Sequence, residues 1–137
     1  MPNLSHLPIV SALRAFPLVG EDSLTLEVFV PNTTVDGDTI VPELHATWVG
    51  LIARALCEVA GGCTETSGTG YWVNPDDGKL TRESTVVLRS CVTRSALLDG
   101  IPRLRSVLMQ YGHECEQAVV AFALDGELFG INPPLPY

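Results

Sequence analysis

Leu and Val occupy every second position over residues 24–30, alternating with Thr25, Glu27 and Phe29, immediately before Pro31. A period of two is typical of a β-strand that buries one face, so this segment is expected to be the first strand. Over residues 44–59 the apolar residues recur every three or four positions instead, which predicts a helix with one buried stripe. Pro42 suits the first turn of that helix, and Gly61-Gly62 is expected to end it.

Residues 63–92 show the pattern of a β-hairpin. Its turn is expected at residues 74–78, because the sequence Asn-Pro-Asp-Asp-Gly is rich in turn-forming residues. A Gly- and Thr-rich strand leads through Tyr71-Trp72-Val73 into this turn, and a second strand leaves it through Val86-Val87-Leu88. Trp72 and Trp48 are both expected to pack in the core.

A second helix is expected to begin at Ser95 or to restart at Pro102, and to end at Gly112. Its buried side is expected to carry Leu98, Ile101, Leu104, Leu108 and Tyr111. The apolar run over residues 117–124 predicts a buried strand, and Asp125-Gly126 predicts a turn into a short fifth strand at residues 127–131. The Pro-rich tail, residues 132–137, cannot continue a central strand because proline has no N–H to donate.

The order strand, helix, strand, strand, helix, strand predicts an α+β fold, the ferredoxin-like βαββαβ sandwich, with both helices on one face of an antiparallel sheet. We expect an N-terminal arm at residues 1–20, the domain at residues 21–131 and the tail at residues 132–137. The arm is apolar, with a short helical turn expected at residues 11–16, and it could dock on a neighbouring subunit. The uncovered sheet face predicts a homo-oligomer, a dimer or trimer, because bare surfaces of that size usually bind something.

Composition narrows the function classes. The 137 residues, 46% of them hydrophobic, suffice for one core and one domain. No run of about 18 apolar residues could span a membrane. A formal net charge of −8 argues against direct binding of nucleic acid, whose affinity comes largely from Lys and Arg. Residues 1–20 lack the uninterrupted apolar segment of a secretory signal, so we expect a cytoplasmic protein.

The hairpin also carries a resemblance. Its motifs are Gly62-Cys63-Thr64, Gly70-Tyr71-Trp72, Asp77-Gly78 and Arg82-Glu83-Ser84. In these residues the chain resembles a family of small bacterial proteins in which a Gly-x-Thr strand leads to Gly-x-Trp, a tight turn and an Arg-Glu-x-Ser strand. The resemblance implies a ferredoxin-like core and no particular activity. By topology alone the chain is also similar to PII-like regulators and to dimeric ferredoxin-like α/β-barrel enzymes.

Motifs for metal, cofactor or covalent chemistry are weak, so we expect no metal and no cofactor. The four cysteines are widely spaced, which fits reduced, mostly buried thiols. His113 beside Cys115 is the one weak alternative, a thiolate with a base. The histidines lack metal-site spacing, and Gly68-Thr69-Gly70 precedes a strand rather than the helix that a phosphate loop needs.

Four side chains are candidates for a ligand site on the open sheet face. If the apolar set of the first strand faces the helices, Glu27 faces the open side. On the second strand of the hairpin, Val86 and Leu88 are the better residues for the core face. Glu83 and Arg89 have the opposite parity, so they are expected on the open side with Glu27. Tyr71 has the opposite parity to Trp72 and is expected there too. Glu27 and Arg89 would then form either a cross-strand ion pair or part of a polar cluster in an apolar cleft.

Three functions remain open. The leading hypothesis is a non-catalytic homo-oligomer that binds a small molecule or a protein partner on the open sheet face. The second is a dimeric enzyme that uses Glu27, Tyr71, Glu83 and Arg89 for acid–base chemistry on a small organic substrate. The third is an acidic decoy that occupies the basic groove of a nucleic-acid-binding protein.

Overall fold

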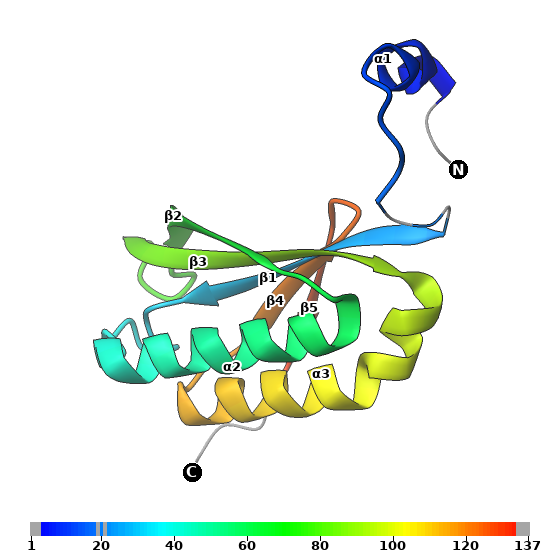
Figure 1. Cartoon of the computed structure of the whole chain (residues 1–137). Helices are drawn as coiled ribbons and strands as arrows, with labels where there is room; N and C mark the ends of the chain where they lie inside the picture. Colours follow the sequence, from blue (N-terminus) through cyan, green and yellow to red (C-terminus); the bar gives the residue numbers. More distant parts are fainter. Residues whose placement is uncertain (1–3, 19, 21, 134–137) are drawn as a thin grey trace.

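The computed structural model describes residues 4–18, 20 and 22–133. In this part of the chain a five-stranded sheet has the order β2-β3-β1-β4-β5, with every neighbouring pair antiparallel. Helices α2 and α3 lie side by side on one face of the sheet (Figure 1). The predicted ferredoxin-like fold and its fifth strand are therefore confirmed. The bounds are β1 Ser23–Pro31, α2 Pro42–Ala60, β2 Thr64–Val73, β3 Leu80–Thr93, α3 Arg94–Glu114, β4 Val120–Leu124 and β5 Glu127–Ile131.

Strand β1 lies in the middle of the sheet, between β3 and β4. Its alternating pattern has the expected effect, because Leu26, Val28 and Val30 are buried toward the helices. Ile52 and Leu56 of α2 are fully buried in the same cluster. The core thus lies between the sheet and the helix pair. Among the described residues no helix covers the opposite sheet face, here called the open face.

Helix α2 follows the sequence pattern closely. It begins at Pro42 and ends before Gly61, whose N–H donates to the carbonyl oxygen of Cys57 (2.8 Å) and whose left-handed backbone (φ 85°) turns the chain out of the helix. Its buried residues form one stripe: Trp48, Val49, Ile52, Ala55 and Leu56.

Helix α3 differs from its prediction at both ends. Thr93 caps it by accepting a hydrogen bond from the N–H of Ala96 (3.1 Å), and it continues through Pro102 without restarting. It also passes Gly112, which is a close-packing glycine and not a stop: a Cβ there would lie 2.5 Å from Cγ of Pro133. Leu98 and Ile101 were expected inside but are 63% and 46% exposed. The buried stripe is Leu97, Leu104, Val107, Leu108, Tyr111 and Gly112.

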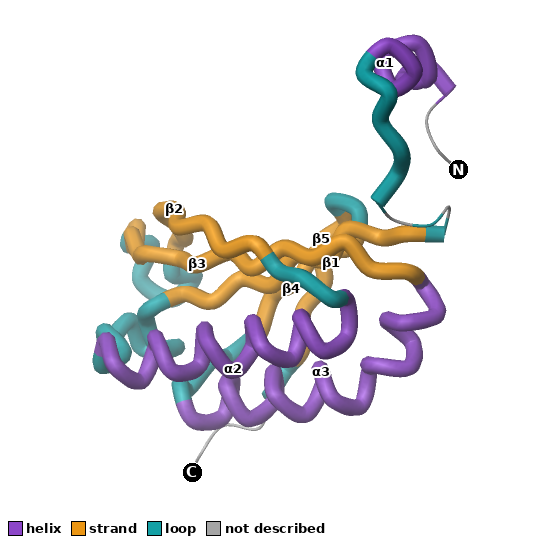
Figure 2. Tube along the Cα trace, in the orientation of Figure 1, coloured by secondary structure: helices purple, strands orange, loops and turns teal. Residues whose placement is uncertain are grey.

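Residues 4–18 of the arm extend away from the domain (Figures 1 and 2). Its helical segment is η1 (Leu4–His6) followed by α1 (Leu7–Ala12), so the helical turn expected at residues 11–16 begins earlier. Of the Pro-rich tail, residues 134–137 lie outside the described residues, and the division into arm, domain and tail stays a prediction. Within the described ranges, no helix has the length and apolar character needed to cross a membrane.

Candidate functional site

A trough of about 720 Å³ is hollowed into the open face of the sheet. Its floor comes from the strands, and its wall comes from the β1–α2 loop and the α3–β4 connection. The surface is mostly apolar, with a few polar groups placed among the apolar ones. The lining residues are Phe29, Pro31, Thr33, Thr34, Val35, Gly68, Thr69, Gly70, Trp72, Glu83, Thr85, Val87, Gln117, Ala118, Val119 and Ala121.

The floor follows from strand register. Val28 and Val30 turn toward the helices, so the alternate residue Phe29 turns toward the open face. Phe29 is paired with Val87 of β3, which is in turn paired with Thr66 of β2. Paired residues share a face, and the trough therefore crosses several strands on one side of the sheet.

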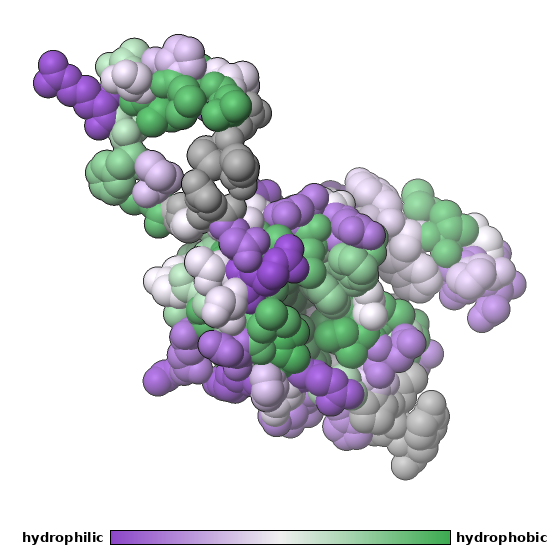
Figure 3. Space-filling view, turned by 90° about the vertical axis from the view of Figure 1, so that its right-hand side faces the viewer, coloured by the Kyte–Doolittle hydropathy of each residue, from purple (hydrophilic) through white to green (hydrophobic). Residues whose placement is uncertain are grey.

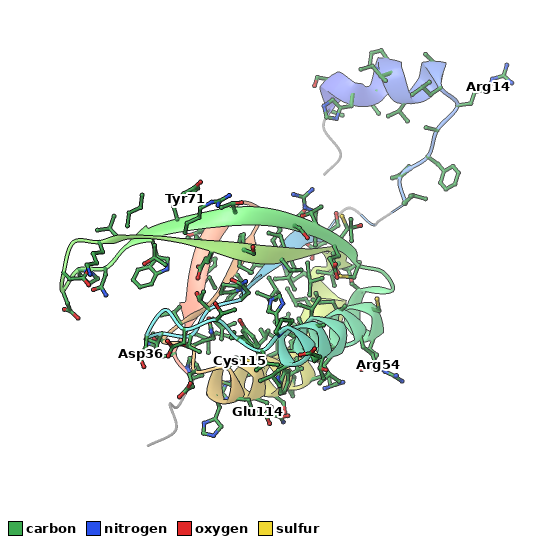
Figure 4. The ribbon with its side chains drawn as sticks, turned by 90° about the vertical axis from the view of Figure 1, so that its left-hand side faces the viewer. Arg14, Asp36, Arg54, Tyr71, Glu114 and Cys115 are labelled. Carbon is green, nitrogen blue, oxygen red and sulfur yellow. The ribbon has the colours of Figure 1, made fainter. Side chains whose placement is uncertain are left out.

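The wall is held by hydrogen bonds between segments that are distant in sequence. Gln117 is buried, and its side-chain amide donates to the carbonyl oxygens of Thr33 (2.7 Å) and Cys115 (2.9 Å). The N–H of Val35 donates to the carbonyl oxygen of Glu116 at 2.8 Å. Figure 4 shows this loop, marked by Asp36, below the β2–β3 hairpin. The wall is thus braced by hydrogen bonds of the chain itself.

Trp72 lines the trough, although the sequence placed it in the core. The register pairs it with Thr81 and pairs Tyr71 with Arg82. Tyr71 therefore lies on the opposite face of the hairpin from Trp72 and Glu83, and it is 61% exposed there, on the outer surface (Figure 4). The expectation that Tyr71 faces the open side is wrong.

The expectation for Tyr71 followed by parity from placing Trp72 in the core, and the hairpin turn shows why that placement is wrong. The predicted turn ended at Gly78, but the N–H of Asn74 donates to the carbonyl oxygen of Lys79 (2.9 Å), and Val73 pairs with Leu80. One extra residue in the turn shifts the register by one, and a shift by one moves every side chain of the strand to the other face.

Glu83 is the only ionisable side chain among the described residues that line the trough. The hydroxyl of Thr33 donates a hydrogen bond to its Oε2. Gly70 lies opposite Glu83, and a Cβ at Gly70 would come within 3.1 Å of the hydroxyl oxygen of Thr85 and 3.8 Å of Oε1 of Glu83. Glycine therefore leaves room around Oε1, the carboxylate oxygen that Thr33 does not engage.

Glu27 and Arg89 form the cross-strand ion pair that was one of the two interpretations of their pattern. Nη2 of Arg89 lies 3.0 Å from Oε2 of Glu27, on directly paired residues. Neither residue lines the trough. The four predicted site residues are thus not brought together: Glu83 lies in the trough, Glu27 and Arg89 pair outside it, and Tyr71 lies on the other face.

Two ionisable groups lie beneath this region, in the core. The hydroxyl of Tyr111 donates to the carbonyl oxygen of Pro31 (3.3 Å), and burial raises its pKa well above the ordinary value. Burial also raises the pKa of the Cys115 thiol to about 11, with a smaller contribution from the charge of Glu114. Both groups are therefore protonated at neutral pH, which removes Cys115 as a thiolate nucleophile. The described residues contain no cluster of three or more metal-ligating side chains.

The wall of the trough was not predicted from the sequence. Thr33, Val35 and Gln117 belong to connections whose positions depend on tertiary hydrogen bonds, and no periodic pattern reports those. Trp72 could have been found from the exact length of the hairpin turn. Glu83 lines the trough on the open face.

No protein-family model matches the chain, and no curated protein matches it. The resemblance drawn from the hairpin motifs therefore does not extend to a family assignment. What remains is similarity of fold, which several solved structures share.

A phage SAM lyase in complex with S-methyl-5'-thioadenosine aligns with a TM-score of 0.58 and 14% identity, covering 85% of this chain and 95% of that chain. A Bacillus cereus protein related to NIF3 aligns with a TM-score of 0.51 and 18% identity, covering 85% of this chain but 27% of its own. The divalent cation tolerance protein CutA1 of Thermus thermophilus aligns with a TM-score of 0.44 and 15% identity, covering 84% and 87% of the two chains. At these identities the likeness to the first two shows a shared fold and leaves the chemistry to the trough itself.

Proposed function

We propose that the protein binds a small, flat organic molecule in the trough and does not transform it. The observation that carries this proposal is one concave surface that combines an apolar floor, the indole of Trp72 and a single carboxylate, Glu83. Its volume, about 720 Å³, falls in the range of small-molecule sites, about 300–1,000 Å³.

The chemistry of the lining favours an aromatic ring that carries hydrogen-bond donors. Trp72 and Phe29 offer flat surfaces for stacking. Oε1 of Glu83 accepts hydrogen bonds, and a charged acceptor is stronger than a neutral one. A nitrogen heterocycle with an amino group or a sugar hydroxyl fits this combination.

The lining favours binding over catalysis. Acid–base chemistry generally uses a proton donor and a proton acceptor placed on either side of the reacting atoms. Among the described lining residues Glu83 has no ionisable companion, and the acid–base set of Glu27, Tyr71, Glu83 and Arg89 is not assembled. The phage SAM lyase shares the fold, but a shared fold does not transfer an activity.

S-methyl-5'-thioadenosine is a suitable first probe. It is the molecule bound by the phage SAM lyase, and it carries an adenine ring, an amino group and ribose hydroxyls. Calorimetric titration with this compound, adenosine and adenine tests the site without assuming which ligand the cell supplies.

Two trough variants and two matched controls make the test specific. Trp72→Ala and Glu83→Gln are each expected to weaken binding about tenfold or more, because one removes a stacking surface and the other a charged acceptor. Tyr71→Ala removes an aromatic ring from the other face of the same strand, and Glu27→Gln removes a carboxylate outside the trough. Both controls should keep wild-type affinity.

Two results would overturn the proposal. If all four variants bind alike, or none of the panel binds, the trough is not a site for this class of ligand. If chromatography of the incubated ligand shows a product that needs Glu83, the protein is an enzyme and not a binding protein.

A further inference from the structure

A second apolar hollow lies on the helix side of the molecule, between α3 and β5, and has a volume of about 390 Å³. We call it the α3–β5 hollow. It is lined by Ile101, Leu104 and Leu108 of α3 and by Phe129 of β5, among others. Val28 of the central strand β1 also lines it and is only 1% exposed, so the hollow reaches down to the core. Figure 3 shows apolar surface among polar residues on the side of the domain where α3 begins.

The hollow exists because the helix layer is narrower than the sheet. Helices pack about 8–10 Å apart, whereas strands lie about 4.8 Å apart, so two helices cover about four strands. The described sheet has five strands, and β5 is at its edge. Phe129 of β5 shares the helix-side face with its paired residue Phe122, yet it remains 41% exposed. The open space beside α3 therefore follows from the topology.

The lining of the hollow has one ionisable side chain among the described residues, that of Arg105. The other lining residues are Leu, Ile, Val, Phe and one glycine, whose side chains form no hydrogen bonds. Asp99 of α3 and Glu127 of β5 are not among them. An occupant must therefore be apolar over most of its length, because a polar group that is buried without a partner is costly. A negative charge on it would be placed beside Arg105.

Arg105 is well suited to hold that charge. Among the described residues it has no ion-pair partner, whereas Arg103 of the same helix pairs with Glu58 (3.1 Å). A guanidinium stays charged at any physiological pH and binds a carboxylate with two parallel N–H donors. An arginine also covers apolar surface with its alkyl stem while its guanidinium stays in water. Arg105 therefore provides a cation at the rim of an apolar hollow.

We propose that the α3–β5 hollow binds a single-chain aliphatic carboxylate of medium length. The carboxylate contacts the guanidinium of Arg105, and the alkyl chain lies along α3 toward Leu97, which also lines the hollow. Leu97 and Arg105 are about 12 Å apart along the helix axis, at about 1.5 Å per residue. An extended chain such as that of decanoate matches this length. The site is separate from the trough, because no described residue lines both hollows.

The lining favours this ligand over other apolar anions. One guanidinium balances one charge, so a dianionic phosphate monoester would keep an unbalanced charge beside a protein of net charge −8. A peptide would bury backbone amides among side chains that offer them no partner. Phe122 and Phe129 stack on each other, with ring centroids 5.5 Å apart, and most of the lining is aliphatic. A flexible alkyl chain fits such a surface better than a planar ring does.

Isothermal titration of the full chain with a ligand series tests the proposal. The series is butyrate, octanoate, nonanoate and decanoate, each below the concentration at which it forms micelles, together with decylammonium. From octanoate to decanoate, each added CH₂ should tighten binding about fourfold through the burial of apolar surface. Butyrate should bind too weakly to be measured. Decylammonium, which has the same chain and the opposite charge, should bind at least about tenfold more weakly than decanoate.

Two variants of the hollow have matched controls on the same helix. Arg105→Gln should weaken decanoate binding about five- to tenfold, and Arg105→Lys should keep most of the affinity because it keeps the cation. Arg103→Gln removes the same charge outside the hollow and should bind as the wild type does. Ile101→Asn, which places a polar side chain in the lining, should weaken binding about tenfold. Leu98→Asn, at an exposed position of α3 outside the hollow, should not. Circular dichroism verifies that each variant is folded.

NMR chemical-shift mapping then locates decanoate on the protein. The amides of Leu104, Arg105 and Gly130 should shift, and the indole N–H of Trp72 in the trough should not. The proposal is overturned if decanoate does not bind, if affinity does not rise with chain length, or if the Arg105→Gln and Arg103→Gln variants bind alike. Shifts at Trp72 in place of α3 would also overturn it. The trough is tested with other compounds and other variants, so the two proposals fail independently.

Discussion

At the scale of single residues, Gly112 lets the end of α3 pack against the chain that follows β5. A Cβ at this position would lie 2.5 Å from Cγ of Pro133 and 3.0 Å from Cγ2 of Val120. Gly112→Ala is therefore expected to lower the free energy of unfolding by about 1–3 kcal/mol through overpacking. Urea denaturation measures this.

Gly50 provides the matched control, because it also lies within a helix, α2, but a Cβ at Gly50 would meet no atom within 4 Å. Gly50→Ala should raise the free energy of unfolding by up to about 1 kcal/mol, the helix preference of alanine over glycine. Equal effects at the two glycines would contradict the close contact at Gly112.

The raised pKa of Cys115 predicts how the free energy of unfolding depends on pH in the alkaline range. Its pKa is about 11 in the fold, raised first by burial, against an ordinary value of 9.0. Its stabilising contribution is complete below pH 9 and is lost as the pH rises toward 11, because the unfolded thiol ionises first. At about 1.4 kcal/mol per unit, the loss is about 3 kcal/mol.

The measurement is the free energy of unfolding between pH 9 and 11 for the wild type and Cys115→Ala. In the variant, the free energy of unfolding should fall less steeply as the pH rises. It should still show some fall, because the raised pKa of Tyr111 acts in the same direction. Identical slopes for the two proteins would show that Cys115 does not carry the dependence.

At the scale of elements, the Glu27–Arg89 pair joins β1 to β3 across the open face. The Arg89 side chain is 61% exposed, so solvent screens the interaction strongly. A double-mutant cycle with Glu27→Gln and Arg89→Met should give a coupling of about 0.2–1 kcal/mol in the free energy of unfolding. A coupling well above this range would mean that the pair is far less hydrated than its exposure implies.

The elements themselves were largely predictable from the sequence, whereas the register and packing between them were less predictable. The period of apolar residues identified β1, α2 and the hairpin because each buries one stripe against the same core. Gly112 was misread because a glycine needed for close packing looks the same in sequence as a glycine that ends a helix. Trp72 was misplaced because strand register depends on the exact turn length, which here includes Lys79.

At the scale of the whole molecule, the trough and a second apolar hollow, which lies between α3 and β5, are on opposite faces of one sheet. The open face was foreseeable from the topology, since both helices cover one side. The wall of the trough was not foreseeable, because it depends on the hydrogen bond from Gln117 to Thr33, which is 84 residues away in sequence.

The most direct test of a ligand site in the trough is mapping of amide and indole chemical shifts by NMR while S-methyl-5'-thioadenosine, adenosine and adenine are added. The account predicts that the shifts concentrate at the Trp72 indole N–H, Gly70, Thr33 and Thr85, and that the other indole, Trp48, which is buried in the core, stays unchanged. Shifts that cluster around Ile101 and Phe129, in the hollow between α3 and β5, or no shifts with any of the three compounds, would contradict it.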